Sequence, residues 1–172
     1  MTILRDDLLA NRTVATNAAG DLREALETLG AEVVDAGRAV GREPGGALDA
    51  LVHDARTAFA EGGPDALLAA LETMWKTIAN TANESLIGSD RGGKVVLIAP
   101  EAGAGEYADA ARAAIENLAR TLSTEWARYG VTTTAVTPRA GTRESDLAVL
   151  VAFIVSEAGD YHSGARLELG AR

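Results

Sequence analysis

Few residues of this sequence have the types and the spacing that chemistry requires. The chain has no cysteine, which excludes thiolate catalysis, disulfide bonds and cysteine-based zinc sites. Its two histidines, His53 and His162, lie far apart in the sequence and in no metal-ligand spacing, so we expect neither to bind a metal. Three arginines remain: Arg23, Arg56 and Arg139 each come shortly after a predicted strand. Guanidinium groups placed there can bind phosphate or carboxylate.

Strand and helix signals alternate along the chain. The predicted strands are residues 12–16, 31–35, 48–52, 94–99, 131–136 and 165–169, and the predicted helices are 21–29, 64–87, 107–129 and 145–156. Asp21 is the predicted N-cap of the first helix, and the glycine-rich segment 36–47 predicts a loop or one short helical turn. Alternating elements predict an α/β fold, a doubly wound parallel sheet of about six strands in three layers with helices on both faces. The length fits one domain over residues 1–172.

Ligands of such sheets bind beyond the carboxyl ends of the strands, so the segments to inspect are 17–23, 53–56, 99–108 and 137–142. The net charge of −9 argues against nucleic acid and anionic membranes, which attract clusters of Lys and Arg. No signal peptide is visible, and the longest apolar run, Ala148–Val155, is too short to span a bilayer. We therefore expect a cytoplasmic protein.

Four segments of the sequence resemble the motifs of one protein family. Residues 112–138, RAAIENLARTLSTEWARYGVTTTAVTP, resemble the pattern K-A-A-V-E-N-L-T-R-T-L-A-x-E followed by G-I-x-V-N-A-V-x-P-G. Residues 93–100 look like G-x-I-V-N-I-S-S, and residues 46–56 look like L-D-x-L-V-N-N-A-G. Residues 150–169 match L-V-x-F-L-x-S-x-x-x-x-Y-x-x-G-x-x-L-x-V. These are the motifs of the short-chain dehydrogenase/reductase family. The resemblance covers almost the whole chain and implies the Rossmann-like fold of a family of NAD(P)-dependent oxidoreductases.

The resemblance also shows where the catalytic groups of the family would stand. Family members use a tyrosine as general acid and base, a lysine one helical turn later and a serine that orients the substrate. An ungapped count places Ala108 at the tyrosine, Arg112 at the lysine and Pro100 at the serine. Alanine and proline have no proton to transfer, and arginine does not reproduce the geometry of lysine. The nearest hydroxyl, on Tyr107, is one residue and so about 100° around the helix from the catalytic position.

The family's cofactor glycines are replaced as well. Asn17, Asp21 and Arg23 occupy the glycine positions of the first turn, and Arg56 and Arg139 occupy two later ones. Their side chains take space that a dinucleotide needs, and the carboxylate of Asp21 would repel a pyrophosphate. We therefore expect this chain to bind no cofactor.

Two family segments are trimmed. Residues 35–47 allow barely one crossover, so a peripheral strand is expected to be absent. Residues 139–144 replace a long substrate-covering segment. The parts that form subunit interfaces in the family are retained, namely the helices 64–87 and 107–129 and the segment 145–169. Trp75 and Trp126 lie on these helices, either as interface or as core residues.

The catalytic residues of the family are replaced, whereas its interface segments are retained, and this favours one hypothesis over two others. In the favoured hypothesis the chain is a non-catalytic subunit, inactive alone. It forms a hetero-oligomer (dimer or tetramer) with an intact NAD(P)-dependent family member through residues 64–87, 107–129 and 145–169. The second is a ligand sensor that binds a small anion or a coenzyme A-type molecule between Arg23, Arg56 and Arg139. A plainer interpretation has these arginines paired with Asp21 or Asp54. The third is an active oxidoreductase with a site rewired through Tyr107 and Arg112.

Overall fold

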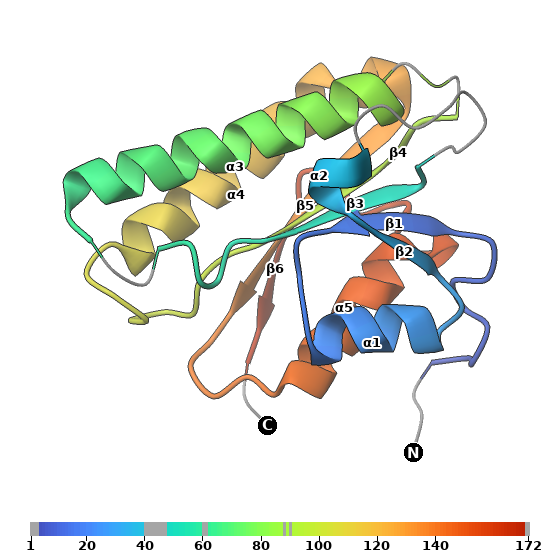
Figure 1. The fold of residues 1–172 in the computed structure, drawn as a ribbon, viewed down its shortest axis with the longest axis horizontal. Helices are drawn as coiled ribbons and strands as arrows, with labels where there is room; N and C mark the ends of the chain where they lie inside the picture. Colours follow the sequence, from blue (N-terminus) through green and yellow to red (C-terminus); the bar gives the residue numbers. More distant parts are fainter. Residues whose placement is uncertain (1–3, 40–47, 60–61, 88, 90, 171–172) are drawn as a thin grey trace.

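The strands form one parallel sheet. The structure is a computed structural model that describes residues 4–39, 48–59, 62–87, 89 and 91–170. Within these residues six strands pair in the order β2-β1-β3-β4-β5-β6, and each neighbouring pair is parallel (Figure 1). They are β1 (Thr13–Thr16), β2 (Glu32–Asp35), β3 (Ala50–Asp54), β4 (Gly93–Ile98), β5 (Val131–Pro138) and β6 (Arg166–Leu169).

Helices cover both faces of this sheet, so the molecule has three layers. One layer holds α2 (Ala36–Ala39), α3 (Pro64–Ser85) and α4 (Ala108–Glu125), and the other holds α1 (Asp21–Thr28) and α5 (Glu144–Val155) (Figure 1). Two short 3-10 helices, η1 (Ala127–Tyr129) and η2 (Glu157–Gly159), follow α4 and α5. The predicted Rossmann-like, doubly wound α/β fold is confirmed.

The central strands are buried on both sides. Leu51 of β3 packs in the core under α3 and α4, whereas the next residue, Val52, packs in the core with α1 and α5. Val95 and Val96 of β4 divide in the same way. Successive side chains of a strand point to opposite faces, and both faces are covered here. This explains why the strands appear in the sequence as continuous apolar runs.

Most element boundaries differ from the prediction by one or two residues, and the differences at the third strand and at the end of the helix 107–129 have a clear physical reason. The third strand runs from Ala50 to Asp54 and not over 48–52, because His53 and Asp54 continue the ladder opposite β4. These polar residues gave no strand signal in the sequence. The predicted helix 107–129 ends as an α-helix at Glu125, and its last turn is η1.

Asp21 is not an N-cap. Gly20 occupies that position with a φ of 60°, and no side chain caps the helix. Asp21 is the first helical residue instead, where its carboxylate still interacts favourably with the positive end of the helix dipole. Of the segment 36–47, residues 36–39 form the single turn α2, and residues 40–47 lie outside the described part. None of the helices in the described residues is long and apolar enough to cross a membrane.

A buried lysine fixes the end of α5 to the sheet. The Nζ atom of Lys94 in β4 donates hydrogen bonds to the carbonyl oxygens of Ile154, at 3.1 Å, and Ser156. It also pairs with the carboxylate of Asp160 at 2.5 Å, and the lysine side chain is only 8% exposed. The last carbonyl groups of a helix have no hydrogen-bond partners within the helix, and a cation placed there interacts favourably with the negative end of the helix dipole.

Replacing Lys94 by methionine should destabilise the fold. The Lys94→Met variant keeps the apolar stem but leaves buried carbonyl oxygens without a donor, so we expect a loss of about 2–3 kcal/mol in the free energy of unfolding. The control is Lys76→Met, which removes an exposed ion pair with Glu72 on α3 and should cost less than about 0.5 kcal/mol. Urea denaturation measures both, and equal effects would contradict the role assigned to Lys94.

Candidate functional site

The switch point of the sheet lies between β1 and β3. From β1 the chain turns to β2 on one side, and it then returns to form β3 on the other side. The carboxyl ends of strands beside such a point form the crevice in which open α/β sheets bind ligands. The segments after β1, β3, β4 and β5 therefore define the candidate site.

Asn17 spans this crevice. Its Nδ2 donates to the carbonyl oxygen of Asp54 at 2.8 Å, and its Oδ1 accepts from the backbone N–H of Asp54 at 2.7 Å. The carboxamide thus extends the pairing of β1 with β3 by one step beyond the ladder. The resemblance places a glycine at this position, where an open backbone would approach a pyrophosphate, and Asn17 closes that space.

Arg56 lies between two carboxylates from distant parts of the chain. Its Nε and Nη2 donate to Asp54 at 2.7–3.1 Å, and its Nη1 and Nη2 donate to Glu144 at 2.5 and 2.8 Å. The hydrogen bonds to Glu144 and then to Asp54 raise the pKa of Arg56. The side chains of Arg56, Asp54 and Glu144 are 22%, 14% and 31% exposed, so water screens the cluster only partly. The guanidinium is therefore neutralised by the protein itself.

The other two arginines are paired separately. Arg23 bonds to Asp35 at 3.1 Å and lies 3.5 Å from Glu27, and Arg139 pairs with Glu168 at 3.0 Å. The expectation that these arginines pair with Asp21 or Asp54 is confirmed for Asp54, which binds Arg56. Asp21 is not among their partners, since Arg23 pairs with Asp35 and Glu27. Each of the three arginines therefore already has an anion.

Arg112 joins the ends of β4 and β5. Its Nη1 donates to the carbonyl oxygens of Pro100 at 2.6 Å and of Pro138 at 2.7 Å. Both prolines lie where their strands leave the sheet, so a donor from α4 supplies hydrogen bonds that the ladder no longer gives. A guanidinium stays protonated and cannot act as a base at neutral pH. Arg112 therefore serves here as a structural hydrogen-bond donor to the ends of two strands.

No proton-transfer group stands beside Arg112 at the positions that the resemblance assigns. Ala108 is 1% exposed and packs in the core as the first residue of α4. Tyr107 precedes the helix as its N-cap residue. Partial burial, and then the neighbouring carboxylate of Glu106, raise the pKa of Tyr107. Catalysis near neutral pH requires the opposite shift for a tyrosine.

The two histidines lie in different surroundings. His53 is a buried residue of β3, and burial lowers its pKa against the opposing effect of Asp54. His162 packs against Phe153, with ring centres 5.6 Å apart. Among the described residues, no group of three or more His, Asp and Glu side chains could hold a metal ion.

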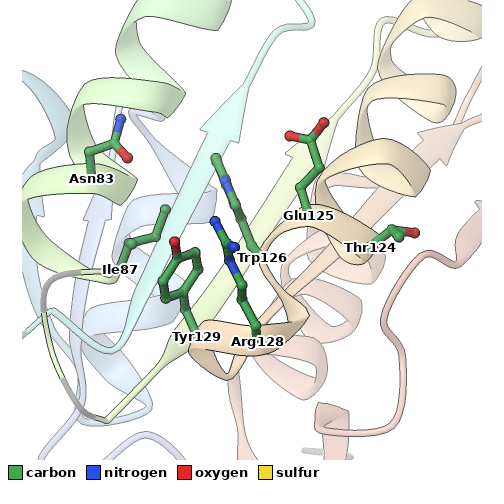
Figure 2. A pocket seen from close by; sticks show the side chains of 7 residues that line it. All are labelled: Asn83, Ile87, Thr124, Glu125, Trp126, Arg128 and Tyr129. Carbon is green, nitrogen blue, oxygen red and sulfur yellow. The ribbon is translucent and has the colours of Figure 1, made fainter.

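A surface hollow of about 520 Å³ lies at the amino end of β5, away from the carboxyl ends of the strands that define the candidate site. Figure 2 shows Trp126, Arg128 and Tyr129 grouped there opposite Asn83 and Ile87. The guanidinium of Arg128 lies 4.6 Å from the centre of the Tyr129 ring. None of the predicted site residues lines this hollow, so we treat it as separate from the candidate site.

The sheet order and the layers define the class of this chain as a Rossmann-like α/β protein. A solved structure described as "citronellol catabolism dehydrogenase (AtuB)" from Pseudomonas aeruginosa PAO1 is similar to it with a TM-score of 0.77. The match covers 98% of this chain and 97% of that chain at 19% sequence identity, which establishes the shared fold. No protein-family model and no curated protein matches the sequence.

The sequence could not identify most partners of these residues. Glu144 lies 88 positions from Arg56 and gave no local signal. The sequence indicates Asn17 only as a replacement for glycine, although an amide directly after a strand can bond to a neighbouring strand end. The two carbonyls bound by Arg112 could not be found from side-chain types at all.

Removing the charge of Arg56 should leave two partly buried carboxylates without a cation. For Arg56→Gln we expect a loss of about 2 kcal/mol in the free energy of unfolding, which is less than for a fully buried pair. The control Arg143→Gln removes an exposed pair with Asp146 on α5 and should cost less than about 0.5 kcal/mol. Thermal and urea unfolding measure both variants. An Arg56→Gln protein as stable as the control would mean that the cluster is not a structural tie.

His53 should make the protein less stable in mild acid. Because burial lowers its pKa in the folded state, the unfolded chain binds the proton more readily, and stability falls as the pH drops below the ordinary value of 6.5. One such proton changes the stability by at most about 1.4 kcal/mol per pH unit. Urea unfolding at about pH 8 and about pH 5.5 should show a smaller difference for His53→Leu than for the natural chain or for His162→Leu. An unchanged difference would contradict this assignment.

Proposed function

We propose that this chain is a non-catalytic subunit, related to short-chain dehydrogenases/reductases, that assembles with an active NAD(P)-dependent member of that family and stabilises it. The observation that supports this most is the position of Arg112. Its Nη1 is bonded to the carbonyls of Pro100 and Pro138, at the place that the resemblance gives to the catalytic lysine. Ala108 stands one turn before it, where the resemblance requires a tyrosine.

The cofactor belongs to the partner in this proposal. A dinucleotide entering the crevice would have to break the two hydrogen bonds between Asn17 and Asp54 and displace Arg56 from its carboxylates. The residues present therefore do not fit NAD(P), and no step of this chain involves it. NAD(P) is expected in the active subunit.

The other two hypotheses lack a supporting observation. An anion sensor needs an unpaired cation, but Arg23, Arg56 and Arg139 each pair with carboxylates. A rewired oxidoreductase needs Tyr107 and Arg112 to act together, but Arg112 is bonded to two backbone carbonyls and Tyr107 precedes α4 as its N-cap residue.

Two apolar surfaces support assembly with a partner. On α3, Leu68 and Trp75 are seven residues apart and share one face of the helix, where they are 66% and 43% exposed. On α5, Val149, Leu150 and Phe153 are half-buried, although the opposite side of the helix already packs on the sheet. A helix that is apolar all round is typically covered on every side. Trp126, by contrast, is a core residue with 7% exposure.

Co-expression tests the assembly. The chain should be produced with intact short-chain dehydrogenases of its own genome, beginning with any encoded beside it, and the complexes should be weighed by light scattering. We expect a stable hetero-oligomer that Trp75→Glu weakens at least about tenfold, since the substitution places a charge in an apolar contact. The control Asn80→Glu adds the same charge on another face of α3.

Two results would overturn the proposal. One is a stable homo-oligomer with no affinity for any intact family dehydrogenase. The other is calorimetric binding of NAD(H) or NADP(H) by this chain alone at micromolar concentration, because we expect no heat of binding with either.

A further inference from the structure

The outer surface of α3 and α4 combines exposed apolar side chains with negative charge. The two helices lie in the same layer, over one face of the sheet (Figure 1). One stripe of α3 holds side chains at intervals of three and four residues, namely Asp65, Leu68, Glu72 and Trp75. Leu68 and Trp75 are large apolar side chains exposed to solvent. Apolar patches rimmed by polar residues mark surfaces that bind other proteins.

Most charged residues of these two helices are acidic. Together α3 and α4 contain six acidic and three basic residues, which gives a net charge of −3. The basic residues are already engaged. Lys76 pairs with Glu72, and Arg120 pairs with Glu116. Arg112 binds two backbone carbonyl groups. Among the described residues, the other four carboxylates of these helices are exposed and make no ion pair: Asp65, Glu84, Asp109 and Glu125.

These four carboxylates frame the apolar side chains. The first and last turns of each helix carry one of them, Asp65 and Glu84 on α3 and Asp109 and Glu125 on α4. Glu125 also lines the hollow at the ends of the two helices, where Figure 2 shows it opposite Asn83 of α3. Interactions between exposed charges extend over about 8 Å at physiological ionic strength. A protein surface that covers the apolar side chains therefore comes within range of the negative charge.

This charge distinguishes between two kinds of partner. A second copy of the chain would present the same net charge of −3, so repulsion between like charges would oppose burial of the apolar side chains. A surface with lysine and arginine around an apolar patch would allow the same burial, and the carboxylates would attract it. Complementary charges of this kind determine the choice of partner and the rate of association.

We propose that the outer surface of α3 and α4 binds a partner whose apolar patch is rimmed by lysine and arginine, and that its carboxylates prevent pairing with a second copy. This selection by charge rests on the proposed subunit role and defines the surface that the active subunit must offer. It leaves Leu68 and Trp75 available for a different chain.

A basic copy of the chain serves as the test partner. It carries Asp65→Asn, Glu84→Lys, Asp109→Asn and Glu125→Lys, which leave two acidic and five basic residues in the two helices, a net charge of +3. The apolar side chains stay in place. A lysine in the last turn of a helix interacts favourably with the helix dipole, so the basic copy should fold. Circular dichroism checks the folding of every variant.

Analytical ultracentrifugation compares the natural chain, the basic copy and their equimolar mixture at about 50 mM and about 500 mM NaCl. We expect the mixture to form a complex at least about tenfold tighter than either copy forms with itself, and the higher salt concentration to weaken it at least about threefold. Trp75→Gln in both copies adds no charge and should abolish the complex. A control copy with Asp21→Asn and Glu24→Lys on α1, in the opposite layer, should not bind the natural chain.

Four results would overturn the proposal. They are a natural chain that pairs with itself through Trp75 as tightly as with the basic copy, a mixture that does not associate, a complex that keeps its affinity after Trp75→Gln, and a control copy that binds equally well. No dehydrogenase takes part in this experiment. Its failure can therefore be distinguished from a failure of the co-expression experiment, which would overturn the subunit role itself.

Discussion

One guanidinium holds the carboxyl edge of the sheet together. Arg112 of α4 donates to the carbonyl oxygens of Pro100 and Pro138, which end two neighbouring strands. The positive charge strengthens both hydrogen bonds, and the half-buried position limits competition from water. Because the donor comes from a helix, the same contact also fixes α4 against the sheet. The edge of the sheet at which this fold usually binds ligands is thus held by hydrogen bonds within the chain.

Hydrogen bonds and ion pairs within the chain also close the switch point between β1 and β3. Asn17 uses both polar atoms of its amide on the backbone of Asp54, and the carboxylate of Asp54 then binds Arg56. Arg56 extends the network to Glu144 at the start of α5. Functional sites leave polar groups free for a ligand at a cost in stability, whereas here the protein satisfies them internally. Asn17, Arg56 and Arg112 therefore all bond to groups of the chain itself at one edge of the sheet.

The sequence predicted the architecture well and the site only in part. Periodic apolar positions located the six strands and the helices α1, α3, α4 and α5 of the described residues, because burial imposes a spacing of two or of 3.6 residues. The boundary of β3 was wrong since His53 and Asp54 are polar, and the cap of α1 was wrong since Gly20 adopts a positive φ. Positions after the strands identified Asn17 and Arg56, and the count along the resemblance identified Arg112. Their partners could not be predicted, because Glu144 and the carbonyl of Pro138 come close only in the folded chain.

Helix α3 separates the core from the surface that the proposed assembly would use. Its inner face, with Met74 and Ile78, belongs to the core. Because a helix turns by about 100° per residue, Leu68 and Trp75 fall together on another face, where both are exposed and an apolar partner would cover them. A substitution at Trp75 therefore leaves the core contacts of the helix unchanged, so a loss of assembly can be distinguished from a loss of folding.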